Sequence, residues 1–169
     1  MPEMPEVEII VQSLREQIVG ETIDDVRVRW LRSIDQPAVD EFIEQLCGQT
    51  IRDVRRRGKF AIMELPQKRL LVHLRMTGQL LVCDAVNEAL EEDKHVHVIF
   101  SFASGRMLYF RDIRKFGRFY LVDAAKEIVG DLGPEPLAKD FTPKSLEEVF
   151  EGRRARIKSL LLNQHVLAG

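Results

Sequence analysis

The sequence predicts an α+β fold that is mainly β: an antiparallel β-sandwich flanked by helices, with a helical C-terminal extension. Three observations support this prediction. The chain has 169 residues, of which 45% are hydrophobic, so it is long enough for one well-buried core and short for two. Strand-like runs crowd its middle, with few helical stretches between them. Gly-Pro-Glu-Pro at 133–136 then breaks this pattern, and only helical periodicity follows it.

The first fifty residues predict two helices and one strand. Apolar residues recur at helical spacing after Pro5 and stop at Gly20, which predicts a helix of about four turns that packs one apolar face against the side of the sandwich. Residues 22–30 alternate as in a strand, with a slip that indicates a bulge. Residues 38–46 have the pattern of a short amphipathic helix.

The rest of the sandwich is predicted from the residues after 50. Strand-like runs occur at 50–65, 69–82, 95–102, 106–110 and 117–122. Pro66 and Gln67 supply a turn between the first two runs, and Ser104-Gly105 is a hairpin signal between the next two. Beyond the sandwich, helices are predicted at 143–150 and 155–163.

The charge distribution is more informative than the total charge. A net charge of −2 argues mildly against a nucleic-acid partner, since domains that bind nucleic acids are often basic overall. However, the run from Ile51 to Lys59 contains five basic residues and one acid, and four more basic residues lie between Arg153 and Lys158. Segregated charge of this kind can make one basic face on an acidic protein.

The cysteines and the apolar runs indicate the compartment. Cys47 and Cys83 lie far apart, have no metal-ligand spacing and have apolar neighbours, so both are predicted to be buried free thiols in a reducing compartment. No signal peptide or long apolar span stands out, so a soluble cytoplasmic protein is expected.

The opening Met-Pro-Glu-Met-Pro-Glu-Val-Glu offers a nucleophile with acids beside it. Removal of Met1 would leave Pro2 with a free secondary amine, close to the carboxylates of Glu3 and Glu6. An α-amino group has an unperturbed pKa of roughly 7.7 to 8.0, so near neutrality an appreciable fraction can attack an electrophilic carbon. The alternative is structural: Pro5 takes the first helical position, and the glutamates after it complement the helix dipole.

Six motifs along the chain resemble, in order, those of the formamidopyrimidine-DNA glycosylase family. Members of that family begin Pro-Glu-Leu-Pro-Glu-Val-Glu, and here Met4 replaces the leucine. The other five are Arg-Gly-Lys-Phe at 57–60, His-Leu-Arg-Met-Thr-Gly at 73–78, Lys-His-Val-His-Val at 94–98, Asp-Ile-Arg-Lys-Phe-Gly at 112–117 and Leu-Gly-Pro-Glu-Pro-Leu at 132–137. No single motif is decisive, but together they cover essentially the whole chain.

The resemblance implies a bifunctional DNA glycosylase and AP lyase that removes oxidised purines, 8-oxoguanine and formamidopyrimidines, in base excision repair through a Schiff base at Pro2. Glu3 matches the acid that handles protons during base loss and ring opening. Glu6 matches a supporting carboxylate near the lesion sugar. Lys59 matches a lysine that assists the elimination steps and contacts DNA, although most lysines in such a place would be solvated charges on an edge strand.

A second group of residues has a structural and a functional interpretation. Met76 and Phe116 would ordinarily be core residues, because methionine in an apolar strand fills gaps. By resemblance, Met76, Arg114 and Phe116 match the side chains that fill the hole left when the damaged nucleotide is flipped out. Gly78 and Gly117 beside them indicate turns, which favours loop tips over strand centres.

Further DNA contacts follow from the resemblance. His95 matches a histidine that contacts phosphate, Arg114 and Arg153 match other DNA contacts, and Lys158 matches a lysine close to the scissile region and the lesion. His95 and His97 would share one strand face, so a metal pair is conceivable, but no third ligand lies nearby in the sequence. No metal site is predicted.

The resemblance also divides the chain. Residues 1–133 are predicted to be the N-terminal catalytic β-sandwich domain, and residues 134–169 a linker and the start of an incomplete helix-two-turn-helix domain. Full-length members continue into a zinc finger. Every ligand of that structural zinc is missing here, so no cofactor is expected in this chain, and its activity alone is predicted to be impaired.

The expected partner is double-stranded DNA with an oxidised base or an abasic site, bound by a monomer without membrane association. Two alternatives remain. An enzyme similar to endonuclease VIII would prefer oxidised pyrimidines, but its usual opening has glycine where Met4 stands. A non-catalytic DNA-binding or structural remnant would have the same fold and form no covalent intermediate.

Overall fold

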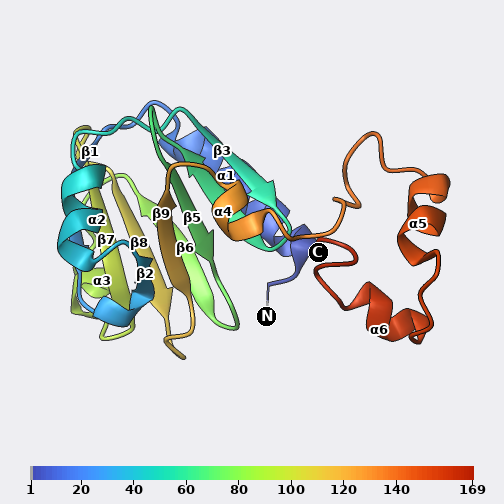
Figure 1. Cartoon of the computed structure of the whole chain (residues 1–169). Helices are drawn as coiled ribbons and strands as arrows, with labels where there is room; N and C mark the ends of the chain where they lie inside the picture. Colours follow the sequence, from blue (N-terminus) through green and yellow to red (C-terminus); the bar gives the residue numbers. More distant parts are fainter. Residues whose placement is uncertain (1) are drawn as a thin grey trace.

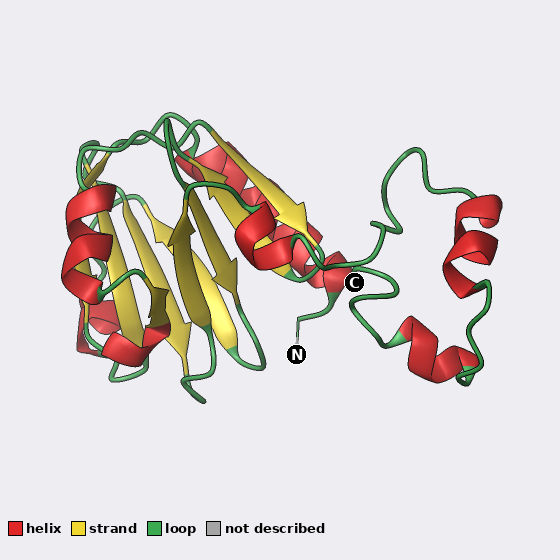
Figure 2. Cartoon of the chain, in the orientation of Figure 1, coloured by secondary structure: helices red, strands yellow, loops and turns green. Residues whose placement is uncertain are grey.

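A computed structural model describes residues 2–169 of the chain. In this part of the chain, nine strands form the two sheets of a β-sandwich (Figures 1 and 2). One sheet has the strand order β1-β7-β8-β6, and the other has the order β2-β9-β5-β4-β3. Neighbouring strands are antiparallel except for the parallel pair of β2 and β9. The predicted fold class is confirmed.

The strands are β1 (Ile23–Val28), β2 (Ile34–Gln36), β3 (Asp53–Arg57), β4 (Phe60–Glu64), β5 (Arg69–His73), β6 (Gly78–Cys83), β7 (Val96–Phe102), β8 (Met107–Asp112) and β9 (Arg118–Val122). The helices are α1 (Met4–Ile18), the 3-10 turn η1 (Leu31–Ser33), α2 (Val39–Leu46), α3 (Glu88–Glu92), α4 (Lys126–Val129), α5 (Pro143–Phe150) and α6 (Ile157–Leu161). The predicted slip in the first strand is a register shift between Ile23 and Asp25.

Two helices close the open sides of the sandwich. Helix α1 packs against β3 and β4 of one sheet and β6 of the other, and α2 packs against β1 and β2 at the opposite side (Figure 1). The apolar face of α1 supplies buried residues at helical spacing, namely Val7, Val11, Leu14 and Ile18. The main core therefore lies between the sheets and is sealed by these helices. This packing fixes the start of α1, where the predicted nucleophile lies.

Smaller apolar clusters cover the outer faces of the sheets. Helix α4 packs Val129 on the outer face of the five-stranded sheet, against Ile62 and Leu71. Leu90 of α3 lies with Tyr109 and Ile99 on the outer face of the other sheet. The sequence patterns had not predicted α3, α4 or β2, because each is five residues or shorter.

Two long predicted strands are each divided in the structure. The run 50–65 forms β3 and β4, with a turn at Gly58 and Lys59, and the run 69–82 forms β5 and β6. Gly58 has a φ of 55° and Arg75 has a φ of 57°, and neither value is compatible with continuous strand. Cys47 and Cys83 are free as predicted, but they are half-buried rather than buried.

The helical extension leaves the sandwich through a neck of two hydrogen-bonded segments, residues 132–135 and 164–168. Gly133 N donates to Gln164 O at 2.9 Å, and Ala168 N donates to Pro134 O at 3.1 Å. A side chain on Gly133 would lie 2.4 Å from the Val166 carbonyl, so this close approach requires glycine. Helices α5 and α6 lie apart from the sandwich beyond this neck (Figure 1). Helix α6 is shorter than the predicted 155–163, and the predicted division into domains stays a prediction.

Among residues 2–169, no helix combines the length and apolar character needed to span a bilayer.

Candidate active site

The start of α1 is held by a capping contact. Glu3 is the N-cap residue, and its backbone N–H donates to the Glu6 carboxylate at 3.0 Å. This contact satisfies one N–H group and places an acid where the helix dipole favours it. Glu6 therefore has the structural role that the sequence allowed, and its predicted role near a sugar stays a prediction. Pro2 is half-buried just before this cap, and Met1, whose removal the amine requires, lies outside the described residues.

Lys59 lies beside this N-terminus, but on a turn and not on a strand as predicted. It is the second residue of the tight turn between β3 and β4. Its side chain is only 12% exposed, and its ammonium forms an ion pair with the Glu3 carboxylate. The structure thus brings together Glu3 and Lys59, and the half-buried side chain of Lys59 is not a solvated surface charge.

The arginines around Lys59 do not form a free basic face. The Arg56 side chain is 5% exposed, and its Nε lies 2.6 Å from Glu8. Its Nη1 lies 2.8 Å from Glu135 Oε1, an ion pair without hydrogen-bond alignment. Arg57 also contacts Glu135, and Arg55 pairs with the carboxylate of Glu64. Three arginines of the predicted basic run are therefore paired with acids outside it, and Arg56 and Arg57 connect the run to α1 and the neck.

Met76, Arg114 and Phe116 lie on two neighbouring loops, the 74–77 loop between β5 and β6 and the 113–117 loop between β8 and β9. Both loops are at the lower edge of the sandwich in Figure 1, where the N-terminus also lies. Met76 is 40% exposed and Phe116 is 47% exposed, so neither is a core residue. The Arg114 guanidinium lies over the Phe116 ring at 4.8 Å from its centroid. The loop-tip interpretation therefore agrees with the structure.

The glycines beside these tips serve close packing. Neither has a positive φ; the left-handed residues are Arg75 and Lys115, each immediately before a tip side chain. A side chain on Gly78 would lie 2.5 Å from the Leu74 carbonyl oxygen, and one on Gly117 would lie 2.4 Å from the Phe110 ring. The loops are thus pressed onto the core at their bases, while their tips remain exposed.

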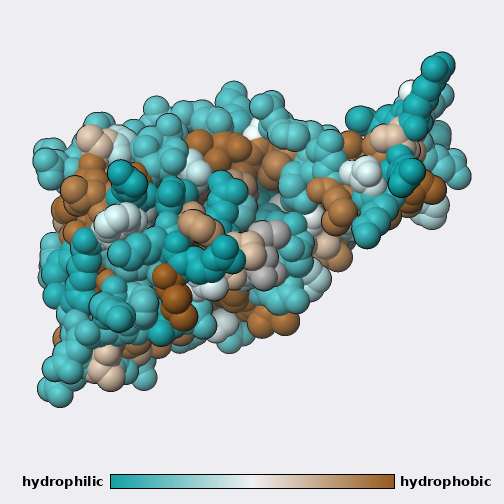
Figure 3. Space-filling view, turned by 90° about the horizontal axis from the view of Figure 1, so that it is seen from below, coloured by the Kyte–Doolittle hydropathy of each residue, from teal (hydrophilic) through white to brown (hydrophobic). Residues whose placement is uncertain are grey.

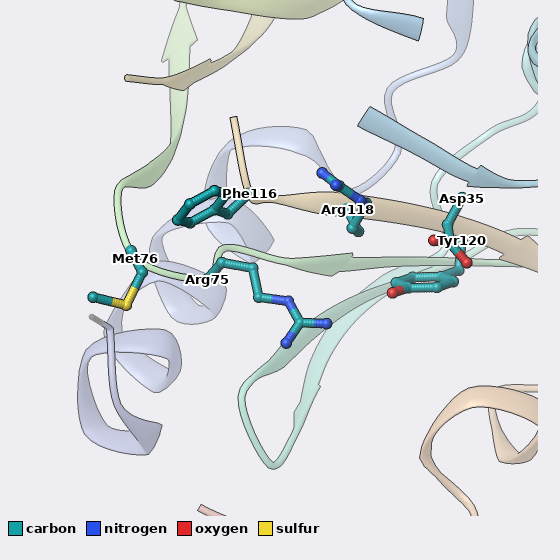
Figure 4. A pocket seen from close by; sticks show the side chains of 6 residues that line it. All are labelled: Asp35, Arg75, Met76, Phe116, Arg118 and Tyr120. Carbon is teal, nitrogen blue, oxygen red and sulfur yellow. The ribbon is translucent and has the colours of Figure 1, made fainter. Parts of the chain in front are cut away.

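A cavity of about 490 Å³ opens beside the two loops. Its lining residues are Asp35, Arg75, Met76, Phe116, Arg118 and Tyr120 (Figure 4). The close-up shows the Arg75 side chain extending into the space between the two tip residues and Tyr120. Seen from below, the surface is largely made of hydrophilic residues, with hydrophobic residues in separate patches (Figure 3). Aromatic rings and guanidinium groups in such a cavity suit contact with bases and phosphates.

His73 connects the lysine and the loops, although the sequence interpretation assigned it no role. Its Nδ1 accepts the backbone N–H of Arg75 at 3.0 Å, which supports the left-handed turn before Met76. Its ring packs edge-on against Phe60, with centroids 4.6 Å apart, next to Lys59 in the chain. Burial, then the charges of Arg75 and Lys59, lowers the pKa of His73 to about 4. Its position in the 73–78 motif was the available signal.

We expect His73 to make stability fall in mild acid. Its pKa in the folded protein is about 4 and its ordinary value is 6.5, so between these values the unfolded chain binds more protons. The contribution of neutral His73 is thus fully present above pH 6.5 and is lost as the pH falls towards 4. The loss should reach about 2 kcal/mol at pH 5.

Urea unfolding at pH 7 and pH 5 measures this loss. In His73→Asn, an amide oxygen can take the Arg75 N–H in place of Nδ1, and the other titrating groups are unchanged. The variant should therefore lose less stability than the natural chain over this interval. Equal losses in the two proteins would contradict the assignment.

The other residues predicted to contact DNA, His95, Arg153 and Lys158, lie in separate parts of the structure. His95 is half-buried before β7, and Arg153 and Lys158 are exposed in the extension, away from the sandwich. His97 is 2% exposed, and its Nε2 lies 2.8 Å from the Asp112 carbonyl oxygen. The conceivable pair of His95 and His97 is therefore wrong, because His97 is a core residue with its own partner.

No group of three or more histidine, cysteine, aspartate or glutamate side chains that could hold a metal occurs within residues 2–169.

Comparison with known proteins gives consistent matches. Residues 1–119 match the family model described as the formamidopyrimidine-DNA glycosylase N-terminal domain. The chain is 44% identical over 175 residues to the formamidopyrimidine-DNA glycosylase of Chloroflexus aurantiacus, covering all of this chain and 61% of that protein. It is also 44% identical to that of Geobacillus kaustophilus, of which it covers 62%. The chain thus spans about three fifths of the length of these relatives.

Solved structures agree. The Lactococcus lactis enzyme in complex with DNA that contains an abasic site superposes with a TM-score of 0.86 at 32% identity, over 99% of this chain and 62% of that one. The Lactococcus lactis enzyme in complex with DNA that contains a formamidopyrimidine-deoxyguanosine lesion gives a TM-score of 0.85 at 33% identity, over 99% of this chain and 63% of that one.

Proposed function

This chain belongs to the formamidopyrimidine-DNA glycosylase family, and from that premise we propose that it removes oxidised purines from double-stranded DNA and cleaves the resulting abasic site. The observation that carries the proposal is the ion pair between the Glu3 carboxylate and the Lys59 ammonium. Glu3 follows Pro2 directly in the chain, so the pair lies next to the proposed nucleophile. A terminal amine with a proton donor and an acceptor beside it has the groups that covalent glycosylase chemistry needs.

The first stage removes the base. The Pro2 nitrogen attacks C1′ of the damaged nucleotide, the bond from C1′ to the base breaks, and the base leaves with its electron pair and takes up a proton. The nitrogen, now an ammonium, passes its proton to the Glu3 carboxylate. Glu3 then gives this proton to the ring oxygen as the bond from C1′ to that oxygen breaks, and the nitrogen is left in an iminium. The fixed pyrrolidine ring favours this step because it holds the nitrogen in one place.

The second stage cleaves the strand. The iminium acidifies the proton on C2′, and its removal expels the 3′ phosphate. Loss of the proton on C4′ in the same way expels the 5′ phosphate, and water then releases the sugar fragment from Pro2. Lys59 stands where it can move protons in these eliminations and attract the phosphates.

The exposed side chains of Met76, Arg114 and Phe116 support action on duplex DNA. Flipping a nucleotide out of a duplex costs a few kcal/mol of stacking and pairing. Apolar side chains placed in the gap recover part of this cost, and an arginine can bond to the orphaned base. A stacked guanidinium and ring at exposed loop tips suit that task.

Borohydride trapping tests the proposal. Reduction in the presence of an oligonucleotide with an abasic site should join the DNA to the N-terminal peptide through Pro2, as read by mass spectrometry. Pro2→Gly should strongly reduce the yield, because the primary amine that replaces the ring is less well placed. Pro5→Ala, which changes the other proline of this segment, should retain it.

Two results would overturn the proposal. One is trapping through Lys59 instead of the N-terminus. The other is an unchanged yield in a protein that retains Met1, whose Pro2 nitrogen would lie in a peptide bond. A protein that forms no covalent complex would instead be the non-catalytic remnant.

A further inference from the structure

Asp112 is a fully buried carboxylate at the base of both tip loops. It ends β8 and is 0% exposed. Its backbone is fixed on both sides, because its N–H donates to the His95 carbonyl at 2.8 Å and its carbonyl oxygen lies 2.8 Å from His97 Nε2. The position of the side chain is therefore set by the core of the sandwich.

The carboxylate gathers donors from two loops that are 35 residues apart in sequence. On the 74–77 loop, the Thr77 hydroxyl donates to Oδ1. On the 113–117 loop, the Arg114 N–H donates to Oδ1 at 3.2 Å and the Gly117 N–H donates to Oδ2 at 2.8 Å. Both oxygens act only as acceptors in this arrangement.

Thr77 also links the loops directly. Its Oγ1 accepts the Arg114 N–H at 3.1 Å while its own hydrogen is given to Asp112. Thr77 follows Met76 in the chain, and Gly117 follows Phe116. Each apolar tip is thus adjacent to a residue that Asp112 holds, and Arg114 is held through its own N–H.

A buried carboxylate is costly to desolvate unless it is fully hydrogen-bonded. No arginine, lysine or histidine forms an ion pair with Asp112 among the described residues, and its partners are all polar groups of the two loops. Its bonds therefore serve loop geometry and not charge neutralisation. Groups held in place before binding avoid the entropy of ordering them on DNA.

We propose that Asp112 is a positioning residue, which together with Thr77 holds Met76, Arg114 and Phe116 as one preassembled unit before DNA binds. The DNA part of this inference depends on the proposed function. The loop-ordering part does not, because it concerns the free protein.

The test uses substitutions that preserve size. Thr77→Val removes the hydroxyl and keeps the shape, Thr77→Ser restores the hydroxyl, and Asp112→Asn replaces an acceptor by a donor. Glu64→Gln is the matched control: this carboxylate is 17% exposed and pairs with Arg55 and Arg69 on strands β3 and β5. It measures what loss of a paired carboxylate does without a contact to either loop.

Three measurements are made on each folded variant. Amide hydrogen exchange at Arg114 and Gly117 reports loop order in the free protein. Binding to a duplex with a stable abasic analogue, with 2-aminopurine opposite the gap, reports insertion of the tips, and trapping on single-stranded abasic DNA reports chemistry that needs no insertion.

Thr77→Val and Asp112→Asn should lose exchange protection and bind the duplex about tenfold more weakly, the loss expected for one hydrogen bond to a charged group. The 2-aminopurine signal should fall in parallel, while single-strand trapping should fall much less. Thr77→Ser and Glu64→Gln should stay close to the natural chain.

The inference would be overturned if Thr77→Val kept the exchange protection and the duplex affinity of the natural chain. It would also be overturned if Glu64→Gln lost as much protection and affinity as Thr77→Val. If the natural chain formed no covalent complex with duplex or single-stranded abasic DNA, the proposed function would be overturned instead. The exchange measurement would then still decide whether Asp112 orders the loops.

Discussion

Replacing Arg56 with methionine is expected to lower the free energy of unfolding by about 3 kcal/mol. The Arg56 side chain is 5% exposed, and its guanidinium joins three segments: Glu8 on α1, the Gly58 carbonyl at the turn, and Glu135 in the neck. Methionine fills similar space but leaves two carboxylates facing a site without a cation. The loss in free energy of unfolding should be at the lower end of the range for broken buried ion pairs, because the Glu8 side chain is 34% exposed and can be hydrated instead.

Urea unfolding of Arg56→Met, compared with Arg55→Met, measures this effect. Arg55 is the neighbouring arginine, is 41% exposed and pairs with Glu64 alone, so its loss should cost about 1 kcal/mol or less. Similar values for the two variants would mean that burial of Arg56 does not make its ion pairs important.

Glu3→Gln is expected to slow excision of an oxidised purine from duplex DNA by about 100-fold to 10,000-fold, the contribution typical of one general acid or base. Glutamine keeps the length of the side chain but cannot give or take the proton, and it removes the anion that holds the Lys59 ammonium. Single-turnover excision is the direct measurement, because it separates chemistry from product release.

Trapping on a preformed abasic site separates the stages of the reaction. The base has already left such a site, and its open-chain aldehyde can react with an amine, so Glu3→Gln should affect trapping much less than excision. Glu44→Gln, on the exposed surface of α2, controls for loss of a negative charge. Excision by Glu3→Gln within about threefold of the natural chain would exclude Glu3 as the proton donor.

Hydrophobic periodicity was sufficient to predict most of the fold. The α1 pattern from Val7 to Ile18 and the hairpin at Gly105 depend on local spacing alone, and both were confirmed. The Gly58-Lys59 turn was missed because strand-like residues flank it on both sides without a gap. A tight turn of two residues leaves almost no trace in such a pattern.

The candidate site shows a different limit. The motifs named Glu3, Lys59 and the loop tips, but they did not reveal the partners that hold them. Glu135 forms an ion pair with Arg56, which is 79 positions away in the sequence, and Thr77 forms a hydrogen bond with Asp112, which is 35 positions away. Pairs this distant are set by the tertiary fold, so the sequence pattern could suggest a basic face from Ile51 to Lys59 but could not show that Arg56 and Arg57 are paired with Glu135.

The neck bears on how freely this part of the chain can vary in length. Since its two segments are joined by the hydrogen bonds of Gly133 with Gln164 and of Pro134 with Ala168, the roughly 30 residues that carry α5 and α6 form a closed loop on a fixed stem. Doubling the length of such a flexible loop costs only about 0.6 kcal/mol of closure entropy. Insertions or deletions between the two segments of the stem should therefore change the reach of the basic cluster from Arg153 to Lys158 without moving Glu3 or Lys59.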